Sequence, residues 1–150
     1  MLTAMLILAE LRDFRRFQAP RALMAFLGLV PGEDSSGEKQ RRGRITRTGN
    51  TLVRRVLVEA AWHYQHRPTV GVALAKRRKG QPTRVIAIAD KAQQRLCRRF
   101  RRLAELHKPA PKIAVAVARE LAGFVWAALQ PPAPAANGHA DARGIDESRR

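Results

Sequence analysis

The sequence predicts a mainly α-helical fold, a small helical bundle, over about residues 1–129. Two observations support this prediction. Apolar residues recur at helical spacing in several segments, and residues that end helices separate these segments, at Gly28, Pro68, Pro82 and Pro109. Residues 130–150 are rich in Pro, Ala and Gly with scattered charges, and we expect a disordered tail there.

Charge is the strongest compositional signal. The 150 residues include 29 Lys and Arg against 12 Asp and Glu, a formal net charge of +17. The positive charges repel one another, and a polyanionic partner would relieve this repulsion. Nucleic acid is the leading candidate and an acidic membrane surface is the alternative. The single cysteine, Cys97, excludes an intrachain disulfide, fits a reducing compartment and lies in a predicted helix as a buried thiol.

We expect a soluble, cytoplasmic protein without a membrane partner. Residues 1–11 are apolar but lack the basic leading region of a signal peptide. Residues 113–129 are apolar but short for a membrane span, and Arg119 and Glu120 interrupt them.

The first half of the chain predicts three helices. Residues 3–12 have a broad apolar face without Gly or Pro, and Phe14 and Phe17 follow as core residues. Pro20 suits the first turn of a second helix that reaches about Leu27 and ends at Gly28. A third helix, residues 51 to about 65, carries an apolar stripe.

The second half predicts three more helices. A short one covers residues 69–76, the longest runs from 82 or 83 to about 107, and the last covers 112 to about 129. The last is apolar almost all round, so it should be central in the bundle or covered by another chain. The longest carries a basic stripe, which is either a solvated face or a phosphate-contacting one: Lys91, Arg95, Arg98 and Arg102.

Residues 28–51 contain too many glycines and too few apolar residues for a core element. The serine pair Ser35-Ser36 precedes Gly37, a basic run follows, and Asn50 is a good N-cap for the third helix. A hydroxyl, cations and a helix N-terminus, when brought together, favour the binding of a phosphodiester. The alternative is a solvated basic loop between two helices. The sequence is also compatible with a short hairpin across the Ser-Gly turn, in which Leu29-Val30 is an extended piece.

Several segments in and after this stretch, taken in their order along the sequence, resemble the C-terminal domain of IS110/IS1111-type transposases (the IS116/IS110/IS902 type). The resemblance covers about residues 2–129. It is carried by an apolar helix end, a Ser-Gly pair, a basic run and the start of a helix, at Phe26–Pro31, Ser35–Gly37, Lys39–Asn50 and Leu52–Ala61.

The resemblance implies a part in DNA recombination and transposition. In that family the serine before the glycine attacks a DNA phosphate, which corresponds to Ser36 here, with Ser35 as the second choice. DNA would be held by residues of the basic run and of the helix that follows: Lys39, Arg41, Arg42, Arg44, Arg47, Asn50 and Arg54. A structured guide RNA is a second polyanionic partner, and the full-length family implies a homo-oligomer.

Metal chemistry is not expected from this chain alone. Its acidic residues do not form a recognisable ligand cluster, and the histidine pair, His63 and His66, is a weak metal motif. The resemblance implies that a divalent metal such as Mg²⁺ is held by a preceding RNase-H-like domain, and that this chain is a truncated copy without it. The isolated chain should therefore be inactive. The alternative function is a non-catalytic, basic, nucleic-acid-binding helical module, a decayed remnant of a transposase.

Overall fold

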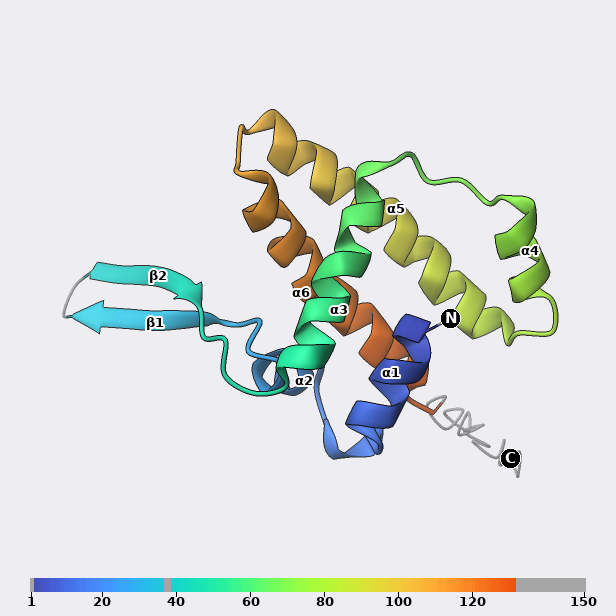
Figure 1. The fold of residues 1–150 in the computed structure, drawn as a ribbon, viewed down its shortest axis with the longest axis horizontal. Coiled ribbons are helices and arrows are strands. Elements are labelled where there is room, and N and C mark those ends of the chain that lie inside the picture. Colours follow the sequence, from blue (N-terminus) through green and yellow to red (C-terminus); the bar gives the residue numbers. More distant parts are fainter. Residues whose placement is uncertain (1, 37–38, 132–150) are drawn as a thin grey trace, which may run out of the picture.

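The computed structural model describes residues 2–36 and 39–131 (Figure 1). Its α-helices are α1 (Leu2–Leu11), α2 (Pro20–Phe26), α3 (Thr51–Ala61), α4 (Val72–Arg78), α5 (Thr83–Glu105) and α6 (Ala110–Leu129). Two 3₁₀ turns, η1 (Phe14–Arg16) and η2 (Trp62–Gln65), and two strands, β1 (Pro31–Ser36) and β2 (Lys39–Ile45), complete the elements. The prediction of a mainly helical fold is confirmed.

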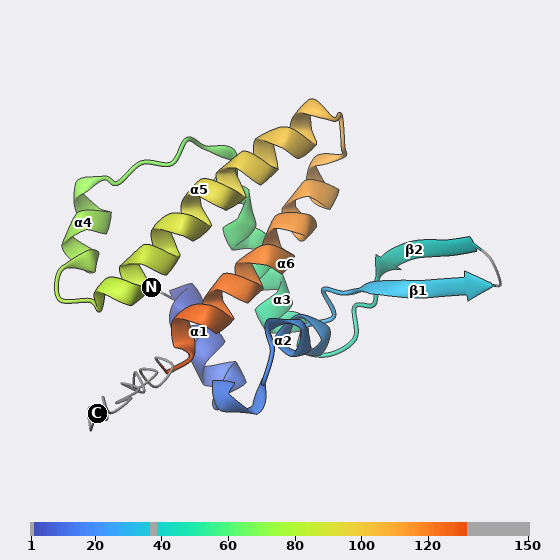
Figure 2. The same ribbon diagram turned by 180° about the vertical axis from the view of Figure 1, so that it is seen from behind.

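Helix α6 is the centre of the bundle, as its apolar sequence predicted. It packs against α5, α3 and α2, and Figures 1 and 2 show these helices around it from both sides. Ala114, Val117, Ala118 and Ala122 of α6 have no exposed surface. Three of these four are alanines, whose small side chains let the neighbouring helices approach closely.

The segment between α1 and α2 is fixed to the core by aromatic residues. Phe14 and Phe17 are buried, which confirms the prediction that they are core residues. The indole Nε1 of Trp126 on α6 donates a hydrogen bond of 2.6 Å to the carbonyl oxygen of Phe17. The segment between α1 and α2 is thus joined to the last helix both by apolar packing and by a hydrogen bond from a partly buried indole.

The boundaries of two predicted helices need correction. The third helix is α-helical only to Ala61, and the predicted remainder forms the 3₁₀ turn η2. The short fourth helix begins at Val72 and ends at Arg78, not at 69 and 76. The carbonyl of Thr69 accepts a hydrogen bond from the side chain of Gln93, and that of Gly71 accepts from Leu74 and Ala75, so the helix begins after Gly71.

The predicted hairpin exists, but its strands are longer than expected and begin after Leu29-Val30. β1 and β2 are antiparallel, and two residue steps along β1 from Pro31 to Glu33 oppose three along β2 from Ile45 to Arg42. The additional residue makes a bulge near the base of the hairpin. Both views show the hairpin projecting away from the helical body (Figures 1 and 2).

None of the helices in the described part of the chain has the length and apolar character needed to cross a membrane. Residues 132–150, most of the tail predicted to be disordered, lie outside the described residues. The first tail residue, Gln130, is held at the end of α6, where its carbonyl oxygen accepts a hydrogen bond of 2.9 Å from Arg84.

Candidate nucleic-acid interface

The hairpin starts from a tightly closed helix end. After α2, Gly28 has a φ of +63°, the left-handed conformation that glycine adopts without strain. The amide of Gly28 donates to the carbonyl of Ala25, and the amide of Leu29 donates to that of Met24. This pattern is a Schellman motif, which satisfies the last carbonyls of α2 and turns the chain toward β1. Leu29 is fully buried, so the turn is anchored in the core.

The chain leaving the hairpin packs directly against the chain entering it. Asn50 donates its amide hydrogen to the carbonyl of Phe26, Arg47 to that of Gly28, and Thr46 to that of Val30. A Cβ atom on Gly28 would collide with the backbone of Thr48, and one on Gly49 would collide with the carbonyl of Phe26. The two glycines therefore permit a backbone approach that any larger residue would block. We call this arrangement, residues 26–30 against 46–50, the hairpin base.

Arg54 lies at the hairpin base. Its Nη1 atom donates hydrogen bonds to the carbonyl oxygens of Leu27 (2.9 Å) and Thr48 (3.3 Å), and its Nη2 atom donates to Oγ1 of Thr51 (3.1 Å). The side chain predicted to contact DNA therefore joins the end of α2 to the segment that leaves the hairpin. In this arrangement Arg54 positions the hairpin.

Asn50 is the N-cap of α3, as predicted. Its side-chain oxygen accepts a hydrogen bond of 2.9 Å from the amide of Val53, and its Nδ2 atom donates one of 2.8 Å to Oε2 of Glu10 on α1. The cap thus ties α3 to α1. Both polar groups of this side chain have protein partners, so it fixes the helix start, and its contact with DNA stays a prediction.

The strand register places the serine pair at the far end of β1. Ser36 is the last residue of the strand and is paired with Lys39, while Ser35 is paired with Gln40. The sequence analysis did not identify a lysine beside Ser36. The sequence contained a signal for this pairing, because antiparallel strands that follow each other closely in the chain place their adjoining ends opposite each other. Lys39 is therefore the residue nearest to Ser36 across the hairpin backbone.

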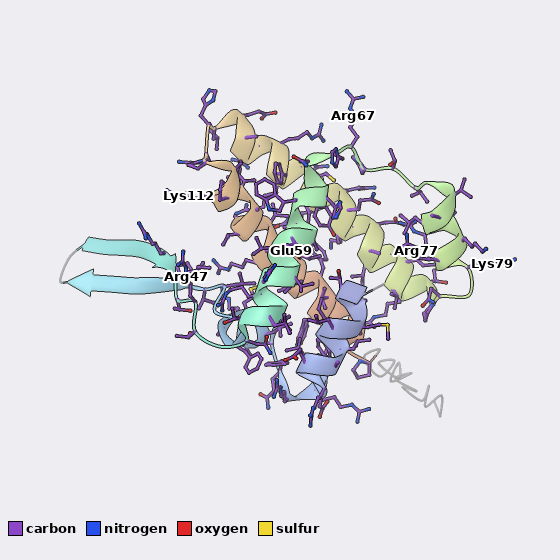
Figure 3. All side chains as sticks on the ribbon, in the orientation of Figure 1. Arg47, Glu59, Arg67, Arg77, Lys79 and Lys112 are labelled. Atoms are coloured by element: carbon purple, nitrogen blue, oxygen red, sulfur yellow. The ribbon has the colours of Figure 1, made fainter. Side chains whose placement is uncertain are left out.

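The arginines of the basic run divide into two sets. Arg41 is paired with Asp34 and Arg42 with Glu33, so the register puts an acidic residue opposite each. Arg44 and Arg47 are exposed near the base. Figure 3 shows Arg47 where β2 joins the helical body, and its φ of +57° reflects the sharp exit of the chain from the strand. The basic run therefore extends along β2 from the base to the loop.

The basic stripe of α5 is partly neutralised by the neighbouring helix. Glu120 of α6 accepts from Nε of Arg95 (3.1 Å) and from Nε of Arg99 (2.9 Å). Lys91, Arg98 and Arg102 are exposed and form no salt bridge with a described carboxylate. The contact of these arginines with Glu120 could not be predicted from the sequence, because α5 and α6 are separate segments of the chain. The α5 face thus retains exposed positive charge that a phosphate backbone would complement.

The described residues do not provide a metal centre. Among them, no group of three or more His, Cys, Asp and Glu side chains is close enough to hold a metal ion. His63 and His66 are exposed at η2, and His66 Nε2 lies 3.4 Å from the side-chain nitrogen of Gln65. The described residues therefore offer no set of three such ligands to a divalent metal.

The fold and the interface define a basic helical domain that presents a serine-containing hairpin. A family model described as the transposase IS116/IS110/IS902 family matches residues 1–73, which include the hairpin and α3. The chain belongs to this family of transposases.

Curated relatives extend the similarity beyond the hairpin. A putative transposase y4qE of Sinorhizobium fredii is 46% identical over 127 residues, which cover 85% of this chain and 33% of that protein. The transposase for insertion sequence element IS1533 of Leptospira borgpetersenii is 34% identical over 103 residues, 68% of this chain and 30% of that protein. The chain thus spans about a third of the length of these relatives. No solved structure matches it.

Proposed function

We propose that this chain is the part of an IS110-type transposase that binds DNA and supplies a serine nucleophile for recombination. The position of the serine pair supports this most strongly. Ser36 ends β1 at the far end of a hairpin that projects from the body, and Lys39 is opposite it in register (Figure 1). A projecting strand pair can approach a phosphate backbone in a groove, where a compact helical surface would be kept out.

Rigidity at the hairpin base supports the same function. The two strands are held to the core by the amides of Thr46, Arg47 and Asn50, which donate to carbonyls of residues 26–30, and by the guanidinium of Arg54. A nucleophile needs a fixed direction of approach, because effective concentration is lost when the reacting atoms are misplaced by about 1 Å. The base would set that direction, while the basic run would hold the phosphates on either side.

The reaction we propose is a transfer of a DNA phosphoryl group to serine. The Oγ atom of Ser36 forms a bond to phosphorus as one P–O bond of the DNA backbone breaks. The serine proton goes to a base, and the departing sugar oxygen takes up a proton. A serine hydroxyl is weakly nucleophilic without such a base or a metal. We therefore propose that activation comes from acidic residues elsewhere in a complete transposase, with a divalent metal such as Mg²⁺.

Nucleic-acid binding without chemistry is the second candidate function. The exposed cations of α5 support it, because they lie on the helical body and need no serine to bind phosphates. A structured RNA would satisfy the same charges as DNA. On this alternative the hairpin arginines add affinity, and Ser36 has no role in covalent chemistry.

A covalent capture experiment separates the two functions. This chain would be combined with the metal-binding domain of a complete relative, incubated with labelled duplex DNA and Mg²⁺, and analysed under denaturing conditions. The catalytic function predicts a protein–DNA adduct that Ser36→Ala abolishes, with DNA binding almost unchanged. Thr46→Ala is a matched control, because it removes an exposed hydroxyl at the hairpin base. Binding without any adduct, beside a domain shown to be functional with its own C-terminal part, would favour the second function.

A further inference from the structure

An open cleft lies on the far side of the molecule from the hairpin. It has a volume of about 570 Å³ and lies between η2, α4 and α5. Figures 1 and 2 show α4 and the hairpin at opposite ends of the molecule. An ion pair between Arg78 and Asp90 holds α4 over α5, and the hydrogen bond from Gln93 to the carbonyl of Thr69 holds the segment before α4. The volume is in the range of sites for small organic groups.

The inner surface of the cleft combines apolar groups with hydrogen-bonding ones. Leu74 of α4 and a row on α5 form its apolar part, which includes Val85, Ile86 and Ala89. The partly buried Tyr64 adds an aromatic ring at one side, and Gln81 contributes an amide. A flat heteroaromatic group would find both apolar contact and partners for its polar edge on such a surface.

The rim of the cleft is cationic. Arg67 follows η2 and Arg77 is on α4, and both line the cleft and are exposed. Figure 3 shows Arg77 between α4 and α5, and the side chain of Arg67 pointing outward at the edge of the molecule. No described carboxylate forms a salt bridge with either. None of the cleft-lining residues is acidic, and Asp90, which follows the lining residue Ala89, is engaged by Arg78. The rim therefore favours a ligand that carries an anionic group next to the flat heteroaromatic group on the apolar surface.

We propose that this cleft binds one unstacked nucleotide of a single-stranded nucleic acid. Its base lies on the apolar surface against Tyr64, and its phosphate lies at the Arg77 side of the rim. A base within a duplex is stacked on both faces and cannot enter, so the cleft selects single strands, loops or displaced ends. Because the cleft is remote from the hairpin, one molecule would hold a duplex at the hairpin and a separate single strand at α4. The site does not depend on Ser36 chemistry.

The test uses two alanines of α5 that are matched in exposure and helix position. Ala89 lines the cleft, whereas Ala87 is exposed on α5 but outside it. The probe is a short oligothymidylate with a single 2-aminopurine, whose fluorescence reports stacking. Ala89→Phe fills the cleft, and we expect it to weaken binding about tenfold and to remove the fluorescence change, because the base then loses its stacking contact. Ala87→Phe should bind like the unmodified chain.

Charge and occupant are tested in the same assay. Arg77→Ala should weaken binding of the oligonucleotide more than Arg21→Ala, which removes an exposed arginine from α2. Duplex binding should be equal in Ala89→Phe and Ala87→Phe, so a failure of this site is distinguishable from a failure of the hairpin. Equal oligonucleotide affinities for the two phenylalanine variants would overturn the proposal. Stronger binding of a polyglutamate peptide than of the oligonucleotide would overturn it too and assign the cleft to acidic peptides.

Discussion

The guanidinium of Arg54 donates a hydrogen bond of 2.9 Å to the carbonyl oxygen of Leu27, 27 residues earlier in the chain. Leu27 has no exposed surface, and its carbonyl lies at the end of α2, where the helix itself leaves carbonyls without partners. The bond therefore joins the end of one helix to the first turn of another. This contact holds the hairpin between them in a fixed direction.

Removing this guanidinium should destabilise the fold. Arg54→Ala leaves the partly buried carbonyl of Leu27 and the exposed carbonyl of Thr48 without this donor, and we expect a loss of about 1–3 kcal/mol in the free energy of unfolding, mostly from Leu27. Arg55→Ala is the matched control. Its salt bridge with Glu59 is exposed and should contribute less than about 0.5 kcal/mol. Urea denaturation measures both, and equal losses would mean that the Arg54 contacts do not stabilise the base.

Glycine 49 should be essential for closing the hairpin base. Gly49→Ala places a methyl group against the carbonyl of Phe26 at a φ of +88°, so we expect a loss of about 3 kcal/mol or more. Gly80→Ala is the control, since Gly80 has a similar φ of +80° but open space around it. It should cost only about 1 kcal/mol, from backbone conformation alone. Thermal unfolding followed by circular dichroism compares the two, and similar losses would contradict the close approach.

These contacts also show what the sequence could and could not predict. Asn50 as an N-cap and Gly28 as a helix end follow from local backbone chemistry, and the burial of Phe14 follows from its apolar ring. Local rules do not reveal which carbonyl a remote arginine will find. The role of Arg54 and the pairing of Arg95 with Glu120 therefore required the packed helices.

The position of Lys39 beside Ser36 required the strand register, which a one-residue slip would have changed. The cleft between η2, α4 and α5 could not be predicted from the sequence either, because its lining comes from three separate elements.

The basic run should control the salt dependence of DNA binding. We expect affinity to fall steeply between about 50 and 200 mM salt, because phosphate contacts release bound counterions. Arg41→Ala, Arg42→Ala and Arg44→Ala together should reduce the slope of log K against log salt by about 2–3, if each contacts one phosphate. Fluorescence anisotropy with a labelled duplex measures the slope. The same slope in the triple variant would remove the hairpin from the binding face.

The thiol of Cys97 should react slowly in the folded protein. Burial raises its pKa, and the positive charge of Arg101 lowers it by a smaller amount. Because the thiolate is the reactive form, the thiolate fraction near neutral pH is below that of a free cysteine. We expect Ellman's reagent to react at least about tenfold faster after unfolding in urea. Fast reaction in the folded state would mean that the reagent reaches Cys97 through the cleft between η2, α4 and α5, which this residue lines, or that α5 opens near it.

The same pKa shift predicts how stability changes with pH. The fold favours the neutral thiol, so its contribution is complete below the ordinary pKa of cysteine and is lost as the pH rises through the raised, folded-state pKa. Cys97→Ala should therefore lose less stability between pH 8 and pH 10 than the unmodified chain. Denaturation midpoints across that range provide the comparison, and identical profiles would contradict a raised pKa.

The final prediction assigns separate roles to Ser36, Ser35 and Lys39. In the presence of the metal-binding domain of a complete relative, the adduct should be linked to Ser36, the last residue of β1. Ser35→Ala should retain most of it, because Ser35 is one residue further from the loop and paired with Gln40. Lys39→Gln should slow adduct formation while DNA affinity falls by less than about tenfold, since one phosphate contact contributes only part of the total.

A lysine that assists transfer acts on the developing negative charge, so its loss should lower the rate at saturating DNA. If the lysine only binds DNA, its loss would raise the DNA concentration needed for half-maximal rate and would leave the rate at saturating DNA unchanged. Arg44→Gln is the matched control, because it removes one positive charge from the same strand near the base. Peptide mapping of the adduct by mass spectrometry identifies the linked serine. Linkage at Ser35 would shift the nucleophile by one position, and equal saturating rates for Lys39→Gln and Arg44→Gln would leave Lys39 as a binding residue only.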